Sequence, residues 1–269
     1  MQRAVELVQG GLTLRGMEHV PDSASRPCPV VAIFHGFTAD KLGPHQLLRK
    51  LSLALEGVGI ASVRFDFAGS GESDGRFQDV TVSGEIADAN SIVDFVRQDR
   101  RFDPSQVMLV GHSVGGLVAS LVAAERPDDV ARLGLIAPAG NLREFVLGLA
   151  QQAGLRADNL EAETFDWGGF LVGRTFAFDL LTLDPYMRAK RFKKPVLLVH
   201  GSADGTVPSR VSLQYRDEVY GDQAEVRVIS GANHTFDSHP WETEVIQSLT
   251  EFLCAGTDSG HPAVANEQA

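Results

Sequence analysis

Residues 107–116 read Val-Met-Leu-Val-Gly-His-Ser-Val-Gly-Gly, and the apolar run before the Gly-x-Ser-x-Gly motif predicts a buried strand. The next residues, 117–124, read Leu-Val-Ala-Ser-Leu-Val-Ala-Ala and favour a helix. A serine between a strand and a helix is typical of a sharp turn that presents its hydroxyl, and the flanking glycines let the two backbones approach closely. Ser113 is therefore the candidate nucleophile. The alternative is an ordinary glycine-containing turn with a solvated serine.

Apolar runs and amphipathic stretches alternate along much of the chain. The pattern predicts a hairpin around residues 10–11, strands at 30–34, 60–65, 133–136, 196–199 and 226–229, and helices near 45–56, 84–98, 209–220 and 241–253. Such alternation is typical of an α/β fold, with a mainly parallel sheet of about eight strands and helices on both faces.

The alternation stops between about residues 139 and 192, where aromatic residues stand among polar residues and glycines. We expect this stretch to be a small cap inserted over the carboxyl edge of the sheet, in a single domain spanning residues 1–254. Residues 255–269 are expected to form a disordered tail. The residues expected to line a substrate pocket are Phe145, Phe165, Trp167, Phe170, Leu171 and Val207. The alternative is that the aromatic residues only form the core of the cap.

The composition excludes several classes of protein. A net charge of -11 opposes binding to the phosphates of a nucleic acid. No apolar segment is long enough for a signal peptide or a membrane span, so we expect a cytoplasmic protein without membrane insertion. The two cysteines, Cys28 and Cys254, have no CxxC spacing and the histidines no HExxH spacing, so we expect no metal site. The sequence leaves the formation of a homodimer open.

Two further polar residues follow predicted strands. Asp204 comes after the strand at 196–199, and His234 comes after the strand at 226–229. Because the carboxyl ends of parallel strands meet at one edge of a sheet, both should lie near Ser113. A serine hydroxyl needs a base to take its proton, and the base needs an acid to orient it. The sequence thus predicts a catalytic triad of Ser113, Asp204 and His234.

Other residues could take these roles. Asp204 precedes a glycine and could simply shape a turn. His239 is the alternative base, and Asp179 and Asp184 are the alternative acids, although neither aspartate follows a core strand.

Acyl transfer also requires hydrogen-bond donors for an oxyanion. One expected donor is the backbone N–H of Val114, which follows the candidate nucleophile. The other is the N–H of Phe37, because Gly36 lets the loop after the strand at 30–34 turn toward the site. We expect His35, in the same loop, to hold this loop by hydrogen bonds.

Five motifs together resemble the α/β-hydrolase family, over about residues 25–254. They are His-Gly-Phe at 35–37, Arg-Phe-Asp at 64–66, Gly-His-Ser-x-Gly-Gly at 111–116, His-Gly-x-x-Asp-x-x-Val-Pro at 200–208 and Gly-Ala-Asn-His at 231–234. Within this family the chain is similar to bacterial serine esterases that include the cinnamoyl (feruloyl) esterases, with a Gly-Gly-Phe segment at 168–170 in the expected cap. Val114 stands where many of those esterases have glutamine.

The resemblance implies a serine carboxylic ester hydrolase that acts through an acyl-enzyme on small to medium acyl or aryl esters and needs no cofactor. Its partner would be a small-molecule ester. The same catalytic residues also serve thioesterases, monoacylglycerol-type lipases and acyltransferases, because the fold does not decide among them. A non-catalytic protein that binds a ligand or a partner is the alternative from another class.

Overall fold

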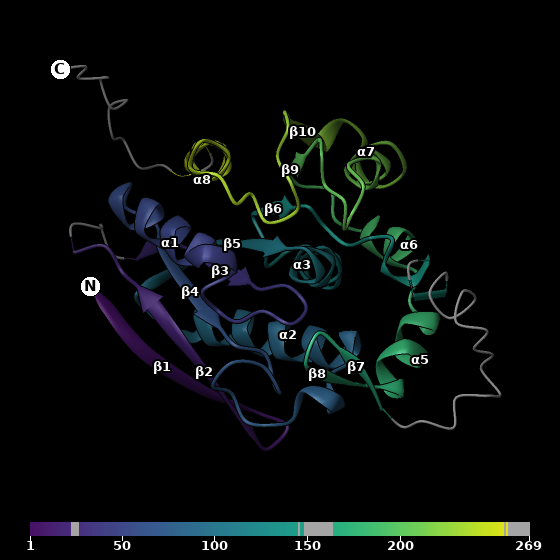
Figure 1. The fold of residues 1–269 in the computed structure, drawn as a ribbon. Helices are drawn as coiled ribbons and strands as arrows, with labels where there is room; N and C mark the ends of the chain where they lie inside the picture. Colours follow the sequence, from purple (N-terminus) through teal and green to yellow (C-terminus); the bar gives the residue numbers. More distant parts are fainter. Residues whose placement is uncertain (23–26, 145, 148–163, 256, 258–269) are drawn as a thin grey trace.

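A computed structural model describes residues 1–22, 27–144, 146–147, 164–255 and 257. Its main sheet has eight strands in the order β1-β2-β4-β3-β5-β6-β9-β10 (Figure 1). The strands are β1 (Gln2–Gln9), β2 (Leu12–His19), β3 (Cys28–Phe34), β4 (Ala61–Phe65), β5 (Phe102–His112), β6 (Arg132–Ile136), β9 (Val196–Gly201) and β10 (Ala224–Ile229). β2 pairs antiparallel with β1 and β4, and all other neighbours are parallel. The predicted α/β class and mainly parallel sheet are confirmed.

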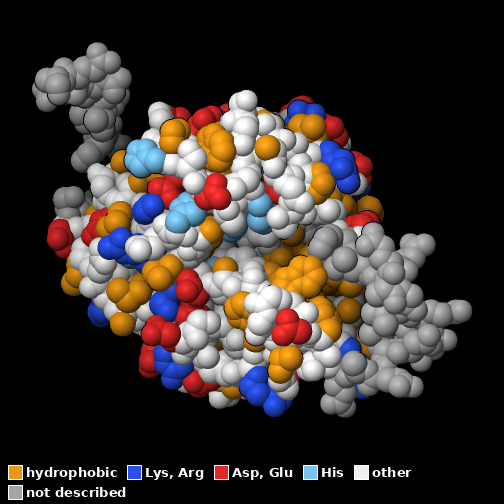
Figure 2. Space-filling model, in the orientation of Figure 1, with side chains coloured by type: hydrophobic (Ala, Val, Ile, Leu, Met, Phe, Trp, Pro, Cys, Tyr) orange, Lys and Arg blue, Asp and Glu red, His pale blue; other side chains and the backbone are white. Residues whose placement is uncertain are grey.

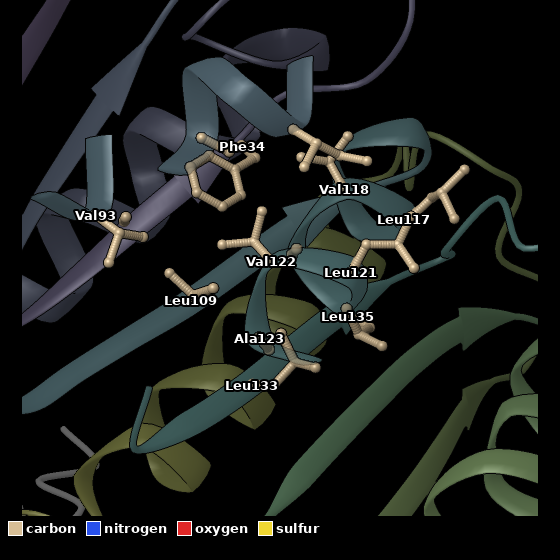
Figure 3. Packing of buried hydrophobic residues seen from close by; sticks show 14 of the residues in the cluster. Phe34, Val93, Leu109, Leu117, Val118, Leu121, Val122, Ala123, Leu133 and Leu135 are labelled. Carbon is tan, nitrogen blue, oxygen red and sulfur yellow. The ribbon is translucent and has the colours of Figure 1, made fainter. Parts of the chain in front are cut away.

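Helices cover both faces of this sheet. The longer ones are α1 (Leu47–Gly57), α2 (Val82–Gln98), α3 (Val114–Glu125) and α8 (His239–Cys254), and a short α7 (Arg210–Gln214) follows β9. Successive side chains of a strand point to opposite faces, so Val30 and Phe34 of β3 pack with α2 and α3, whereas Val31 and Ile33 pack with α1 and α8. Figure 3 shows the first of these two cores, where Phe34 lies among side chains of α3 and the neighbouring strands.

The stretch between β6 and β9 carries four described elements. β7 (Thr164–Trp167) and β8 (Phe170–Gly173) form an antiparallel hairpin, which is followed by α5 (Arg174–Thr182) and α6 (Pro185–Ala189). α5 is tied to the start of α2, because the backbone N–H of Ser83 donates to Asp179 at 2.8 Å. The ring of Phe176 stacks on Phe37 with centroids 4.7 Å apart, so the stretch also contacts the loop after β3.

The expected helices at 45–56 and 209–220 differ most from the structure, whereas those at 84–98 and 241–253 begin two residues earlier than expected. α1 starts at Leu47 because His45 and Gln46 have positive φ angles of 39° and 65°. The expected helix at 209–220 consists of α7 and a π-helical turn over Tyr215–Tyr220. Phe145 and almost all of the expected tail at 255–269 lie outside the described residues. None of the helices in the described ranges is long and apolar enough to span a membrane.

Candidate active site

Ser113 occupies a sharp turn between β5 and α3. Its φ and ψ angles are 56° and -118°, a conformation that residues with a side chain rarely adopt. A side chain at Gly111 would overlap the carbonyl of Gly115, and one at Gly115 would overlap the carbonyl of His35. The glycines of the motif are therefore required by the close approach of strand, helix and loop. The N–H of Ser113 donates to the carbonyl of Ile136 at 2.8 Å, which fixes the turn against β6.

The structure brings Ser113, His234 and Asp204 together. The hydroxyl Oγ of Ser113 lies 2.9 Å from Nε2 of His234, and Nδ1 of His234 lies 2.7 Å from Oδ2 of Asp204. An ionised Asp204 accepts a hydrogen bond from Nδ1–H of His234, which leaves Nε2 as the acceptor for the serine hydroxyl. These three residues come from loops that follow β5, β9 and β10, as the sequence predicts.

Asp204 is buried and accepts hydrogen bonds at both oxygens. Oδ1 accepts from the N–H groups of Thr206 and Val207, each at 2.8 Å, and Oδ2 accepts from His234. Burial alone would raise the pKa of Asp204, but the hydrogen bonds from His200 and His234 outweigh it and hold the pKa well below its usual range. The carboxylate is therefore ionised at neutral pH and can stabilise a positive charge on His234.

His200 is a second histidine on this carboxylate. Its Nε2 lies 3.1 Å from Oδ2 of Asp204 and 2.8 Å from the carbonyl of Val207, so Nε2–H donates between them. Its Nδ1 lies 2.7 Å from the hydroxyl of Ser212, which donates to it. His200 therefore fixes both the acid and the loop around it.

The two expected oxyanion donors flank Ser113. Phe37 and Val114 both line the cavity that contains the serine. Val114 is the first residue of α3, and N–H groups in the first turn of a helix have no partner within the helix. His35 holds the loop of Phe37, because Nδ1 donates to the carbonyl of Gly36 at 2.9 Å and Nε2 accepts from the N–H of Phe67 at 3.0 Å.

Two more histidines hold the loop that carries His234. His112 is buried, which lowers its pKa to about 3, and its Nε2 donates to the carbonyl of His234 at 3.1 Å. His45 lies two residues before α1, with Nε2 2.7 Å from the carbonyl of Thr235 and Nδ1 2.6 Å from Glu242. Both partners of His45 are acceptors, so its ring links the loop of Thr235 to Glu242 at the start of α8. These bonds also explain how His45 is held in its unfavourable backbone conformation.

A cavity of about 450 Å³ opens above Ser113. Figure 2 shows a hollow in this face of the molecule, with histidine side chains at its edge and hydrophobic side chains gathered beside it, over β7 and β8. The described residues that line the cavity are Gly36, Phe37, Thr38, Ala39, Asp40, Gly43, Pro44, His112, Ser113, Val114, Ala139, Asn141, Leu142, Trp167, Thr206, Val207, His234 and Thr235.

Two of the expected pocket residues, Trp167 and Val207, line this cavity, and three do not. Leu171 pairs with Asp166 in the hairpin, so its side chain points to the face opposite that of Trp167. Phe170 shares the face of Trp167 but packs on the ring of Phe77, with centroids 4.7 Å apart. Phe165 also shares this face, yet it is 43% exposed and lies outside the lining.

Sequence reasoning missed several residues around the site. The roles of His200 and His45 depend on contacts with Asp204 and Thr235, which the sequence does not display. Asp40 and Leu142 gave no signal apart from following the strands β3 and β6.

The parallel sheet, the strained serine at the β5–α3 turn and the hydrogen bonds from serine to histidine to aspartate define an α/β-hydrolase. A family model described as serine aminopeptidase, S33, matches residues 25–165, and the chain belongs to this family of hydrolases.

Solved and curated relatives agree with this class. The structure of Est1E from Butyrivibrio proteoclasticus with bound ferulic acid superposes with a TM-score of 0.84 and 26% identity, covering 94% of this chain and 99% of that one. A monoacylglycerol lipase of Mycolicibacterium smegmatis is 23% identical over 91% of this chain and 94% of its own length. A mitochondrial palmitoyl-protein thioesterase of Bos taurus is 28% identical over 66% of this chain and 58% of its own length. The chain spans 58% of the length of this thioesterase and 62% of the length of an uncharacterised protein of Mycobacterium tuberculosis that is 27% identical over 76% of this chain.

Proposed function

We propose that this protein is a serine carboxylic ester hydrolase that acts through an acyl-enzyme on small to medium acyl or aryl esters. The hydrogen-bonded series from Ser113 to His234 to Asp204 carries the proposal, with separations of 2.9 Å and 2.7 Å. Phe37 and Val114, whose backbone N–H groups are the proposed oxyanion donors, line the same cavity.

Each group has a defined step in this mechanism. Nε2 of His234 takes the proton of the Ser113 hydroxyl as Oγ attacks the ester carbonyl, and the oxygen that becomes negative is held by the N–H groups of Phe37 and Val114. His234 then gives its proton to the departing alcohol, which leaves the acyl group on Oγ. A water molecule, deprotonated by the same Nε2, releases the acid. Asp204 orients the imidazole and stabilises its charged form throughout.

We propose further that residues 139–192 act as a cap and hold the acyl part of the substrate. Support comes from the apolar side chains that this stretch places in the cavity, namely Leu142 and Trp167. Contact with apolar side chains favours acyl groups that bury carbon surface on binding. The fit to a structure that contains ferulic acid supports an aryl acyl group among these substrates.

Hydrolysis of p-nitrophenyl butyrate tests the proposal. The Ser113→Ala variant should lose activity by about a million-fold in kcat, since the residues of a triad act as a unit. Ser105→Ala is the matched control, because Ser105 is exposed on β5 and does not line the cavity, and it should keep the wild-type rate. Retention of several per cent of the activity in pure Ser113→Ala protein would remove Ser113 from this role.

A thioesterase is the second candidate, favoured by the match to the palmitoyl-protein thioesterase. The two activities need the same triad and differ only in the leaving group. Rates on a matched ester and thioester of one acid separate them: a thioesterase should hydrolyse the thioester at least about a hundred-fold faster in kcat/KM, which corresponds to about 2.7 kcal/mol.

A further inference from the structure

The cavity has an unbalanced charge. Asp40 is the one carboxylate among the described lining residues, and none of these described residues is a lysine or an arginine. Oδ1 of Asp40 accepts the N–H of Leu42 at 2.7 Å, an arrangement that holds the carboxylate in place within its turn. The described lining therefore has one negatively charged group, and the buried guanidinium of Arg64, which interacts electrostatically with Asp40, lies outside this lining.

The lysine that follows Asp40 is held elsewhere. Nζ of Lys41 lies 2.6 Å from Asp66 and 2.9 Å from Glu72, and neither of these carboxylates lines the cavity. The hydrogen bonds to these two carboxylates also raise the pKa of Lys41, against the effect of its burial. Lys41 is thus paired with Asp66 and Glu72, and among the described contacts no hydrogen bond or ion pair joins it to Asp40.

Asp40 lies on the side of the cavity where the alcohol part of an ester would sit. Gly43 and Pro44 line the cavity beyond Asp40, and the next residue, His45, is bonded to the carbonyl of Thr235 at 2.7 Å. The loop of residues 38–44 therefore lies against the loop that carries the base. Because the departing oxygen takes its proton from His234, the alcohol extends along these loops, and the acyl part takes the side of Leu142 and Trp167.

We propose that Asp40 is a specificity-determining residue that makes the site favour a cationic alcohol over its neutral isostere, and both over an anionic alcohol. The inference rests on the proposed ester hydrolysis and adds the charge preference of its leaving-group side. At an effective dielectric constant of about 40, a positive ligand charge about 6 Å from a carboxylate lowers the Kd by about ten-fold, and a negative charge raises it by the same factor.

Three butyrate esters of similar size test this preference. They are the choline ester, which is cationic, the 3,3-dimethylbutyl ester, which has the same shape without the charge, and the 2-sulfoethyl ester, which is anionic. For the wild type we expect kcat/KM to fall about ten-fold at each step along this series. The ratios should shrink in 0.5 M NaCl, because salt screens a partly exposed charge.

The Asp40→Asn variant removes the charge and keeps the oxygen that accepts from Leu42. We expect the ratio of kcat/KM for the choline ester to that for the dimethylbutyl ester to be about ten-fold lower in this variant than in the wild type. Asp222→Asn is the matched control, because it makes the same change in net charge at an exposed residue that does not line the cavity. Its ratio should equal that of the wild type.

The same three esters distinguish a wrong role for Asp40 from a wrong proposal of ester hydrolysis. Equal kcat/KM values for the choline and dimethylbutyl esters in the wild type would overturn the role of Asp40, while their hydrolysis would still support an esterase. A ratio that falls equally in Asp40→Asn and Asp222→Asn would also overturn it. Absence of hydrolysis of all three esters, together with no reaction of Ser113 with a fluorophosphonate, would overturn the proposed function and this inference with it.

Discussion

A buried carboxyl group on α2 should make the protein less stable as the pH rises. Glu85 is only 3% exposed, and its Oε2 has no hydrogen-bond partner among the described residues. Burial, followed by the nearby carboxylates of Asp88 and Asp179, raises the pKa of Glu85 from 4.5 to about 8. Glu85 is therefore a neutral acid in the folded protein at neutral pH. We predict that Glu85→Gln removes most of the loss in the free energy of unfolding that Glu85 causes as the pH rises.

The sign follows from proton binding. Between pH 4.5 and 8 the unfolded chain has released the Glu85 proton and the folded protein keeps it, so the free energy of unfolding falls as the pH rises. This loss of stability is absent below the pKa of Glu85 in the unfolded chain, and it grows until the pH reaches the pKa of Glu85 in the folded protein. Integrated from about pH 5 to about pH 8, this single group lowers the free energy of unfolding by about 3 kcal/mol.

Urea unfolding at pH 5 and pH 8, followed by circular dichroism, measures this difference. Because glutamine has the shape of the neutral acid and does not titrate, the loss of stability between the two pH values should be about 3 kcal/mol smaller in Glu85→Gln than in the wild type. Glu244→Gln is the control, since Glu244 is an exposed carboxylate on α8, and its profile should run parallel to that of the wild type. An equal loss of stability in Glu85→Gln and the wild type would refute the reasoning.

Three further predictions concern the candidate active site. Asp204→Asn should lower kcat by about ten-thousand-fold without unfolding the protein, because the asparagine favours the wrong tautomer of His234; near-full activity on p-nitrophenyl butyrate would reassign the acid. His200→Ala removes a hydrogen-bond donor from Asp204 and so raises the pKa of Asp204 in the folded protein. Ionised Asp204 stabilises the fold at pH values above its unfolded pKa, and this stabilisation is lost as the pH falls through its folded pKa. The midpoint of acid unfolding, measured by circular dichroism, should therefore move to higher pH, and an unchanged midpoint would contradict the bond. His45→Asn, which tolerates the backbone conformation but cannot reach Thr235, should lower kcat by about ten-fold and KM far less, whereas an unchanged kcat would show that the tether does not position the loop.

Local patterns were enough to predict the parts of the site that depend on one turn of the chain. The β5–α3 turn is built from consecutive residues, and the glycines around Ser113 reflect contacts between neighbouring backbones. Asp204 and His234 could be placed because each follows a strand directly, and the parallel sheet aligns those strand ends.

The remaining parts depend on contacts that sequence spacing does not encode. His45 and Thr235 are 190 residues apart and meet only because α1 and α8 share one face of the sheet. The pocket residues were chosen by their hydrophobic character, which Trp167 and Leu171 share. The register of the β7–β8 hairpin separates them, since it turns Trp167 toward the cavity and Leu171 away from it.

Reaction with a fluorophosphonate, followed by mass spectrometry of the intact protein and of its peptides, tests the central claim most directly. The mechanism requires Ser113 to be a nucleophile activated by His234 in the folded protein. We predict one adduct per chain, located on Ser113, and no adduct in Ser113→Ala or after unfolding of the wild type. An adduct on another serine, or an active esterase whose Ser113 stays unmodified, would contradict the account.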